Sequence, residues 1–313
     1  MHARPSDEVL SLVRAMGKMG GFMAPNLEKI ASTLDSMQTT GCTRFLSFPA
    51  DIVATGARGL LIDLVKGGFV DAIITTCGTL DHDIARTLGS YYHGSFDLDD
   101  ARLRREGFHR LGNVLIPLDS YGPAIEKFLR PVLSRLYKDG THSTTTESLC
   151  KEIGHELGSA HSLLYWAQKR EVPVFVPGIT DGAVGSQLWL FAERHRDFAV
   201  DLMGDERRLS DITSEAKKTG ALVIGGGISK HHLIWWNLFR GGLDYACYVT
   251  TAMEYDGSLS GAQVREAVSW GKVKVKAAQA TLYAEATLVL PLIVSYLQTR
   301  SAKRKPASSQ NRL

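Results

Sequence analysis

The chain has 313 residues, of which 44% are hydrophobic and 22% are charged, and its formal net charge is +3 at pH 7. A chain of this size can bury a large core, as one α/β domain or two smaller ones, and the near-balanced charge excludes a strongly basic nucleic-acid-binding protein. No apolar run reaches the roughly 20 residues of a membrane-spanning helix. Residues 1–5 lack the apolar stretch of a secretory signal. We therefore expect a cytoplasmic protein.

Six short apolar runs rich in β-branched residues are predicted strands: residues 43–48, 71–76, 113–117, 172–177, 221–225 and 245–251. Helical periodicity lies between most of them, at residues 52–66, 124–136, 185–197 and 231–240, with a kink or break expected at Pro131. Continuous apolar strands that alternate with helices predict a parallel sheet covered on both faces.

Residues 139–148 form the most polar internal stretch, which we expect to be a loop with Thr145 or Ser148 as the N-cap of the next helix. A second domain could begin there, but the strands on both sides are equally apolar, and we favour a single domain over residues 1–299. Residues 300–313 place basic side chains among Ser, Pro and Gln and are predicted to form a disordered basic tail.

The cysteines are widely scattered and form no CxxC pair; they are Cys42, Cys77, Cys150 and Cys247. This spacing predicts neither a metal site nor a disulfide framework, and free thiols agree with a reducing compartment.

Ligands of open parallel sheets bind beyond the carboxyl ends of the strands. The first candidate end holds Thr76, Cys77 and Gly78, whose small side chains allow a cofactor to approach the backbone, followed by Asp81 and His82. The alternative is a plain strand-to-helix turn in which Asp81 starts the helix.

Two further strand ends carry suitable residues. Asp181 follows residues 177–180 and could hold ribose hydroxyls, although an Asx-turn is a common alternative. The run from Gly225 to Gly227 precedes a predicted helix and is compatible with a phosphate-binding turn. His231 follows it, either as a proton carrier or as a helix-capping histidine.

The fourth candidate is the segment that ends at Lys272, two residues after Trp270 and six after Glu266. Lysine does covalent chemistry only where its amine can be neutral, which requires an apolar, crowded setting. A nearby aromatic ring and an acid would suit an amine substrate. Taken alone, a solvated lysine beside a core tryptophan is the commoner case.

The longer pattern is more specific. The chain carries, in this order, Lys230-His231-His232, Leu243-Asp244-Tyr245-Ala246, Thr250-Thr251-Ala252, Glu254-Tyr255-Asp256-Gly257-Ser258, Ser260-Gly261-Ala262, Glu266-Ala267-Val268-Ser269-Trp270-Gly271-Lys272 and Tyr283-Ala284-Glu285-Ala286. In order and spacing these segments resemble the deoxyhypusine synthase family in its short archaeal form. The resemblance extends from about residue 41 to about residue 298.

The resemblance implies a Rossmann-like, doubly wound, mostly parallel sheet and a set of site residues. It gives Lys272 the role of covalent nucleophile and His231 that of general base. The residues that it places around the amine substrate are Glu266, Trp270, Gly226, Asp81, Gly257 and Ser258. Those that it places on NAD are Thr76, Cys77, Gly78, His82, Asp181, Thr251, Ala252, Asp256, Glu285 and Ala286.

The resemblance also implies a reaction. Members of the family oxidise spermidine with NAD, transfer its aminobutyl group to the enzyme lysine and then to one lysine of the hypusine-containing translation initiation factor, and reduce the new imine with the retained NADH. They are homotetramers. Trp235, Trp236 and the pair Tyr91-Tyr92 are expected to pack or to contact another subunit, and Lys274 and Lys276 to be charges on the surface of a strand.

Three positions depart from the eukaryotic pattern. Leu259 and Ser186 stand where an acid is expected, and Trp235 stands where an asparagine is expected. Each change removes a polar contact to a polycation, worth about 1.5–3 kcal/mol. The alternatives therefore include a homospermidine synthase-like transfer to a free diamine and a non-catalytic NAD-binding paralogue. A bare dehydrogenase would give no role to the residues from Trp270 to Lys272.

Overall fold

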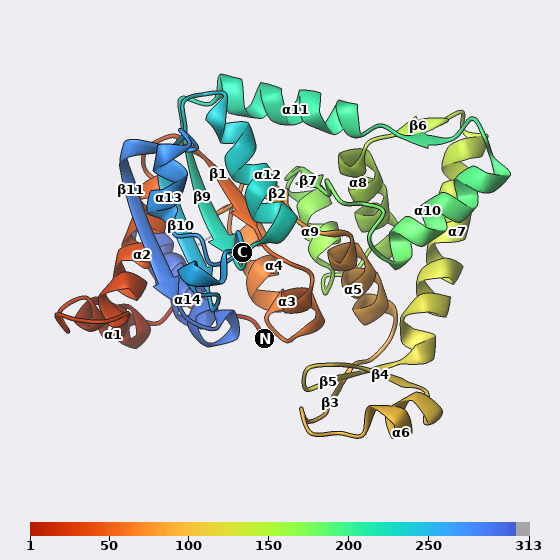
Figure 1. The fold of residues 1–313 in the computed structure, drawn as a ribbon, viewed down its shortest axis with the longest axis horizontal. Coiled ribbons are helices and arrows are strands. Elements are labelled where there is room, and N and C mark those ends of the chain that lie inside the picture. Colours follow the sequence, from red (N-terminus) through yellow and green to blue (C-terminus); the bar gives the residue numbers. More distant parts are fainter. Residues whose placement is uncertain (305–313) are drawn as a thin grey trace, which may run out of the picture.

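The computed structural model describes residues 1–304, and its centre is a six-stranded sheet (Figure 1). In spatial order its strands are β11 (Val273–Tyr283), β10 (Leu243–Thr250), β9 (Lys218–Ile224), β1 (Cys42–Ser47), β2 (Ala72–Ile74) and β7 (Val174–Phe175). Every pairing in this sheet is parallel. The chain starts in the middle at β1, builds out to β7, returns to β9 beside β1 and builds out to β11. This order is that of a Rossmann-like, doubly wound α/β fold, as predicted.

Helices connect these strands. They are α1 (Asp7–Met16), α2 (Ala24–Met37), α3 (Asp51–Ala54), α4 (Arg58–Lys66), α5 (Cys77–Leu88), α6 (Asp100–Arg105), α7 (Gly122–Lys138), α8 (Thr146–Leu157), α9 (Leu163–Lys169), α10 (Ala183–Arg194), α11 (Leu202–Glu215), α12 (Gly227–Leu238), α13 (Val264–Ser269) and α14 (Ala286–Arg304), with short 3₁₀ turns η1 (Leu118–Ser120) and η2 (Glu254–Asp256). None of the described helices is long and apolar enough to cross a membrane.

The strands alternate between two apolar cores, because successive side chains point to opposite faces of a sheet. In β1, Phe45 belongs to one core and Leu46 to the other. Helices α12 and α13 cover the core that contains Phe45, whereas α2, α4 and α14 cover the core that contains Leu46. Burial on both faces explains why these strands are apolar throughout.

Two small sheets lie outside the main one. Strands β3 (Tyr92–His93), β5 (Val114–Pro117) and β4 (Phe108–Leu111) form an antiparallel sheet beside α6, at the bottom of Figure 1. Strands β6 (Ser143–Thr144) and β8 (Ala199–Val200) form a parallel pair. The strand predicted at residues 113–117 therefore exists, but it is not part of the parallel sheet. The long strand β11 was not among the six predicted strands.

Two helix predictions need correction. Residues 52–66 form two helices, because the hydroxyl of Thr55 donates to the carbonyl of Ile52 and accepts from the amide of Ala57, which competes with helical bonding. Helix α7 runs through Pro131 without a break; Pro131 lies on the exposed side of the helix, where water can satisfy the freed carbonyl. Thr145 is the N-cap of α8, as predicted, and accepts from the Ser148 amide at 3.1 Å.

The predicted tail starts too early. Residues 300–304 are the last turn of α14, and Arg300 and Arg304 both form ion pairs with Asp35 of α2. At the other terminus, the Ser6 amide donates to the Thr299 hydroxyl at 2.8 Å, which ties the start of α1 to α14. Residues 305–313, the rest of the predicted tail, lie outside the described residues.

Candidate active site

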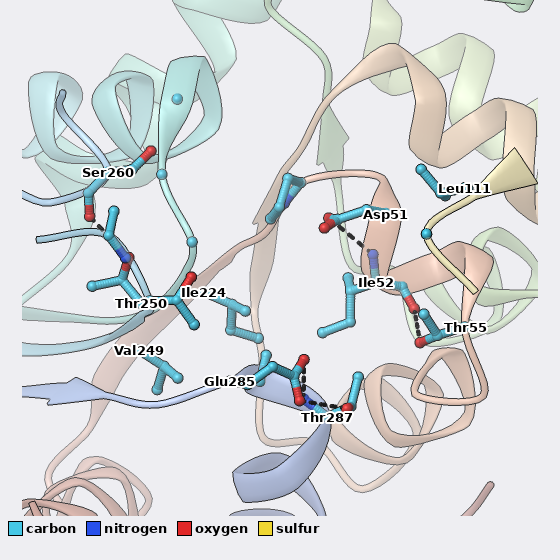
Figure 2. A pocket seen from close by; sticks show the side chains of 18 of the residues that line it. Asp51, Ile52, Thr55, Leu111, Ile224, Val249, Thr250, Ser260, Glu285 and Thr287 are labelled. Atoms are coloured by element: carbon cyan, nitrogen blue, oxygen red, sulfur yellow. Dashed lines mark hydrogen bonds between the residues drawn. The ribbon is translucent and has the colours of Figure 1, made fainter. Parts of the chain in front are cut away.

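A cleft of about 710 Å³ lies at the carboxyl ends of the main-sheet strands (Figure 2). It lies where β1 and β9 meet, the point at which the strand order reverses and at which open α/β sheets bind ligands. Segments that follow β1, β2, β9, β10 and β11 all contribute to its wall. Among the predicted site residues, those that line the cleft are Thr76, Gly226, Thr251, Ala252, Glu285 and Ala286.

The glycine run forms a tight turn at the cleft wall. Gly225 and Gly227 have φ angles of +68° and +70°, the left-handed region that favours glycine. Gly226 has no space for a side chain, because a Cβ there would lie 2.2 Å from Oγ of Ser260. The turn leads directly into α12, so the free amides and the positive end of a twelve-residue helix lie at the cleft. This arrangement suits an anionic ligand group.

Glu285 lies at another part of the cleft wall, before α14. Its carboxylate accepts from the amide of Thr287 at 2.9 Å (Figure 2) and from that of Leu288 at 3.1 Å. The side chain is exposed, so its remaining lone pairs are available to a ligand hydroxyl. Thr76, at the N-cap of α5, makes no capping hydrogen bond with its side chain, so its hydroxyl can also face a ligand.

Sequence reasoning missed part of this wall. Pro49, Asp51 and Ile52 line the cleft directly after β1 and could have been found, because that strand was predicted and begins the sheet. Phe96 and residues 111–114 reach the cleft from the small antiparallel sheet. No sequence signal places that small sheet beside the cleft.

A second cluster surrounds Lys272, which is only 7% exposed. Its ammonium nitrogen lies 5.1 Å from the ring centroid of Trp270 and 5.5 Å from that of Trp235. His231 is stacked on Trp235, with 5.6 Å between the ring centroids and 23° between the ring planes. The structure therefore brings together the predicted nucleophile, the predicted base and the predicted aromatic residue, and adds a second tryptophan.

Local geometry explains this arrangement. His231 and Trp235 are four residues apart on α12 and so lie on the same face of the helix. Trp270 ends α13, and Gly271, with φ of +71°, reverses the chain so that Lys272 directly precedes β11. Trp235, which was expected to pack or to contact another subunit, packs against both Lys272 and His231.

Burial and the neighbouring Lys272 charge lower the pKa of His231 below its ordinary value. The imidazole is therefore neutral near pH 7 and can accept a proton. Helix α12 joins the two clusters, since its first turn lines the cleft and His231 follows one turn later.

Glu266 and the segment before it lie at the exposed rim. Glu266 is exposed on α13, and its charge acts on the buried Lys230 and Tyr248. Asp256 is exposed and accepts from the Ser258 amide at 2.6 Å, which lowers the pKa of its carboxyl. Gly257, between them, has a φ of +75° in an open turn. None of these four site residues lines the cleft.

Asp81 is fully buried inside α5, which begins at Cys77, so Asp81 does not start that helix. Its carboxylate accepts from the amides of Ala183 and Val184 at 2.9 and 2.8 Å and from the Tyr121 hydroxyl at 2.8 Å. Burial raises the pKa of this carboxyl. In this arrangement Asp81 anchors the start of α10, and no oxygen of it reaches the cleft.

The remaining predicted cofactor residues also lie outside the cleft. Cys77 is fully buried and Gly78 is half-buried beside it at the start of α5. The ring of His82 is hydrogen-bonded to the Tyr91 hydroxyl at 2.8 Å, and burial lowers its pKa to about 4. Asp181 is exposed in the turn before α10.

Two of the departures have local roles in the structure. The hydroxyl of Ser186 donates to the carbonyl of Gly182 at 3.0 Å, within α10. The carbonyl of Leu259 accepts from Nζ of Lys230 at 2.6 Å.

Comparison with known proteins agrees with this geometry. A family model described as deoxyhypusine synthase matches residues 11–297. A probable deoxyhypusine synthase of Thermoplasma volcanium is 53% identical over 91% of this chain and 92% of its own length, and one of Picrophilus torridus is 52% identical over 92% of each chain. The fold is similar to a crystal structure assigned to deoxyhypusine synthase from Entamoeba histolytica, with a TM-score of 0.66 and 22% identity over 91% of each chain. The protein therefore belongs to the deoxyhypusine synthase family of transferases.

Proposed function

We propose that this protein transfers the aminobutyl group of spermidine to one lysine of the hypusine-containing translation initiation factor, with NAD in the cleft and Lys272 as the nucleophile. The observation that carries the proposal is the enclosure of Lys272 by Trp235, Trp270 and His231, one turn along α12 from the cleft at the start of that helix. This places a buried amine and a neutral base beside a cofactor-sized cavity.

The cleft has the features that a dinucleotide requires. Its position at the reversal of strand order and its glycine turn at a helix N-terminus fit a pyrophosphate. Glu285, Thr76 and Thr251 supply oxygen atoms for ribose hydroxyls. When bound, NAD supplies the hydride acceptor for oxidation of the donor amine and returns the hydride at the end. Gly226 is essential to this fit, because its missing side chain lets Ser260 pack against the turn.

Lys272 then acts on the oxidised donor. Its neutral amine attacks the imine carbon, a C–N bond to Nζ forms, and the C–N bond to 1,3-diaminopropane breaks. His231 accepts the proton that Lys272 loses and returns a proton to the departing amine. Trp235 and Trp270 shield the amine from water and provide ring faces for the cationic groups of the polyamine. The acceptor lysine repeats the attack and regenerates Lys272.

Two rim residues complete the proposed donor site. Glu266 is an exposed carboxylate that can hold a substrate ammonium, and Gly257 and Ser258 form an open turn that we also assign to the donor site. We keep Asp81 out of direct contact with the amine, because its oxygen atoms are already bonded within the protein. Five residues that the resemblance places on NAD lie outside the cleft, and they would need local movement to contact the cofactor. They are Cys77, Gly78, His82, Asp181 and Asp256.

Transfer to a free diamine is the second candidate function. The position of Trp235 is the observation that supports this second reaction. A tryptophan in direct contact with Lys272 replaces the polar group expected there, so the amine is held by ring faces instead of a hydrogen bond. Contacts with ring faces discriminate less between polyamines of different length than a hydrogen bond at a fixed position does.

One experiment separates these reactions. The protein is incubated with NAD, spermidine labelled in its aminobutyl group, a free diamine and the cognate translation factor. Label on the factor agrees with the first reaction, and label only in a small polyamine agrees with the second. If NAD binds and no label moves to any acceptor, both reactions are excluded.

We also propose that the enzyme works in the cytoplasm, where its protein acceptor is made and used, and that it is a homotetramer. The exposed aromatic side chains of Trp189 and Phe239, 61% and 65% exposed, are suited to subunit contact. Light scattering on the purified protein measures the assembly directly.

A further inference from the structure

Lys230 is a buried lysine to which the proposed reaction gives no role. It is 1% exposed, although it directly precedes the proposed base His231 on α12. Its Nζ donates to the carbonyls of Leu259 at 2.6 Å and Ala262 at 2.7 Å. The same nitrogen lies 4.4 Å from the ring centroid of Tyr248 in β10. A charged amine therefore has two carbonyls and one ring face as partners, with no carboxylate in contact.

The carbonyls bonded to Lys230 belong to residues 258–262, the segment between the turn at Gly257 and helix α13. Ser260, in the middle, lines the cleft and packs against Gly226. From the other side, the Thr250 hydroxyl donates to the Ser260 carbonyl at 3.0 Å. Three carbonyls of one short segment are thus fixed by side chains from α12 and β10.

We propose that Lys230 is a positioning residue that holds residues 258–262 against the start of α12, and so keeps the dinucleotide cleft and the Lys272 enclosure in register. The inference builds on the proposed function, since the proposed function assigns NAD to the cleft and the donor amine to the surroundings of Lys272. Lys230 touches neither ligand. It acts through Ser260, which shapes the cleft, and through the turn at Gly257 and Ser258, which we assign to the donor amine. Burial lowers the pKa of Lys230 to about 8, which agrees with an enclosed site rather than a surface charge.

The test uses Lys230→Met, which keeps the length of the side chain and removes its donors. Lys66→Met is the matched control, because Lys66 also lies over an aromatic ring, 4.7 Å from the centroid of Trp166, but is exposed as the last residue of α4. Amide hydrogen exchange is measured on the whole protein without ligands. We expect exchange in residues 257–263 to become at least ten-fold faster in Lys230→Met, with unchanged exchange in β1 and β9. Lys66→Met should leave both regions unchanged.

Kinetics supply the functional readout. We expect Lys230→Met to raise the KM for both NAD and spermidine by about ten-fold or more, while kcat at saturation falls less than about three-fold, because bound ligands restore the register. A fall in kcat alone, or unchanged exchange in residues 257–263, would overturn the proposal. If wild-type protein transfers no label, the proposed function fails, but hydrogen exchange and NAD affinity still test the role of Lys230.

A second variant guards against misfolding of Lys230→Met. Thr250→Val removes the hydrogen bond to Ser260 from the opposite side of the same segment with almost no change in volume, and it also removes the bond that the Ala252 amide donates to the Thr250 hydroxyl at 3.1 Å. We expect faster exchange confined to residues 257–263 and a rise of about three-fold or more in the KM for NAD. Unchanged exchange in this variant contradicts the idea that side-chain bonds to these carbonyls hold the segment in place.

Discussion

The side chain of Lys272 lies between two indole rings and beside a histidine, and each neighbour affects a different part of the proposed reaction. In the proposed reaction the ring faces accept cationic groups, whereas His231 exchanges the proton. We propose the covalent role for Lys272 alone, since no other described lysine lies over two indole rings.

Lys272→Arg should lower label transfer by at least about 10³-fold, because a guanidinium stays protonated and cannot attack. NAD affinity should change less than about three-fold, since Lys272 does not line the cleft. Lys276→Arg, at an exposed position of the same strand, is the control and should keep full activity. Rapid transfer by Lys272→Arg rules out the covalent role.

Trp235→Asn should move the acidic limb of the pH–rate profile to higher pH. His231 must be neutral to accept a proton, and its pKa is lowered by burial and by Lys272. Removing the stacked indole exposes the imidazole to water, so its pKa rises toward the ordinary value and the base becomes protonated earlier as pH falls. The measurement is kcat/KM from about pH 5 to 8.

Trp236→Phe is the control for that profile, because Trp236 donates to Glu206 and packs on Phe239, away from His231. Its acidic limb should coincide with that of the wild type. An identical limb in Trp235→Asn would show that stacking does not set the protonation of His231.

Lys230 should give the protein a measurable gain in stability at alkaline pH. Its folded pKa is lowered to about 8 by burial, against the opposing charge of Glu266, from an ordinary value of 10.5. Below pH 8 both states hold the proton, and between about pH 8 and 10.5 only the unfolded state does, so the free energy of unfolding rises with pH by up to about 3 kcal/mol.

The comparison is with Lys230→Met, which cannot titrate at this position. The difference in unfolding free energy between wild type and variant, measured by urea denaturation at several pH values, should grow in favour of the wild type across this window. A constant difference contradicts the lowered pKa.

At the scale of elements, the turn between β9 and α12 sets the shape of the cleft. Gly226→Ala should weaken NAD binding by about ten-fold or more, because the new Cβ would lie 2.2 Å from Ser260 and overpacking costs about 1–3 kcal/mol. Gly122→Ala, in open space at the start of α7, is the control and should bind NAD normally. Normal NAD affinity in Gly226→Ala would show that the contact with Ser260 is dispensable.

The elements of the main sheet were largely predictable, because strands buried on both faces leave continuous apolar runs in the sequence. Five of the six predicted strands lie in the parallel sheet. Strand β11 was not predicted, because buried residues in it are interrupted by exposed ones such as Val275 and Lys276. The strand therefore lacks a continuous apolar run. Residues 113–117 had the composition of a buried strand but pair in a separate antiparallel sheet.

The site was predictable where its residues share a motif, and not where distant elements meet. Thr76, Gly226 and Glu285 were found through strand ends and the family resemblance. Trp235 was assigned to packing, because nothing local to α12 shows that its face meets the end of α13. Phe96 was missed for the same reason, since the contact depends on how the small sheet lies against the main one.

At the scale of the whole molecule, the two ends of the chain are joined on one side of the sheet. Arg300 and Arg304 in the last turn of α14 pair with Asp35 of α2, and Lys303 pairs with Asp7 of α1 at 2.5 Å. The side chain of Asp35 is only 9% exposed, so it depends on these partners.

Truncation after residue 299 should therefore destabilise the protein by about 1–3 kcal/mol, because it leaves a mostly buried carboxylate without its cations. Truncation after residue 304 is the matched control and keeps all three ion pairs. Thermal unfolding compares the two proteins at neutral pH. Equal melting temperatures would show that the last turn of α14 contributes nothing to stability.

Helix α12 begins with the glycines of the cleft and, one turn later, carries the histidine that faces Lys272. A helix moves as a stiff body, so its start cannot swing outward without pulling the imidazole away from the amine. Under the proposed function, an outward movement of the cleft wall would therefore also separate the proposed base from Lys272.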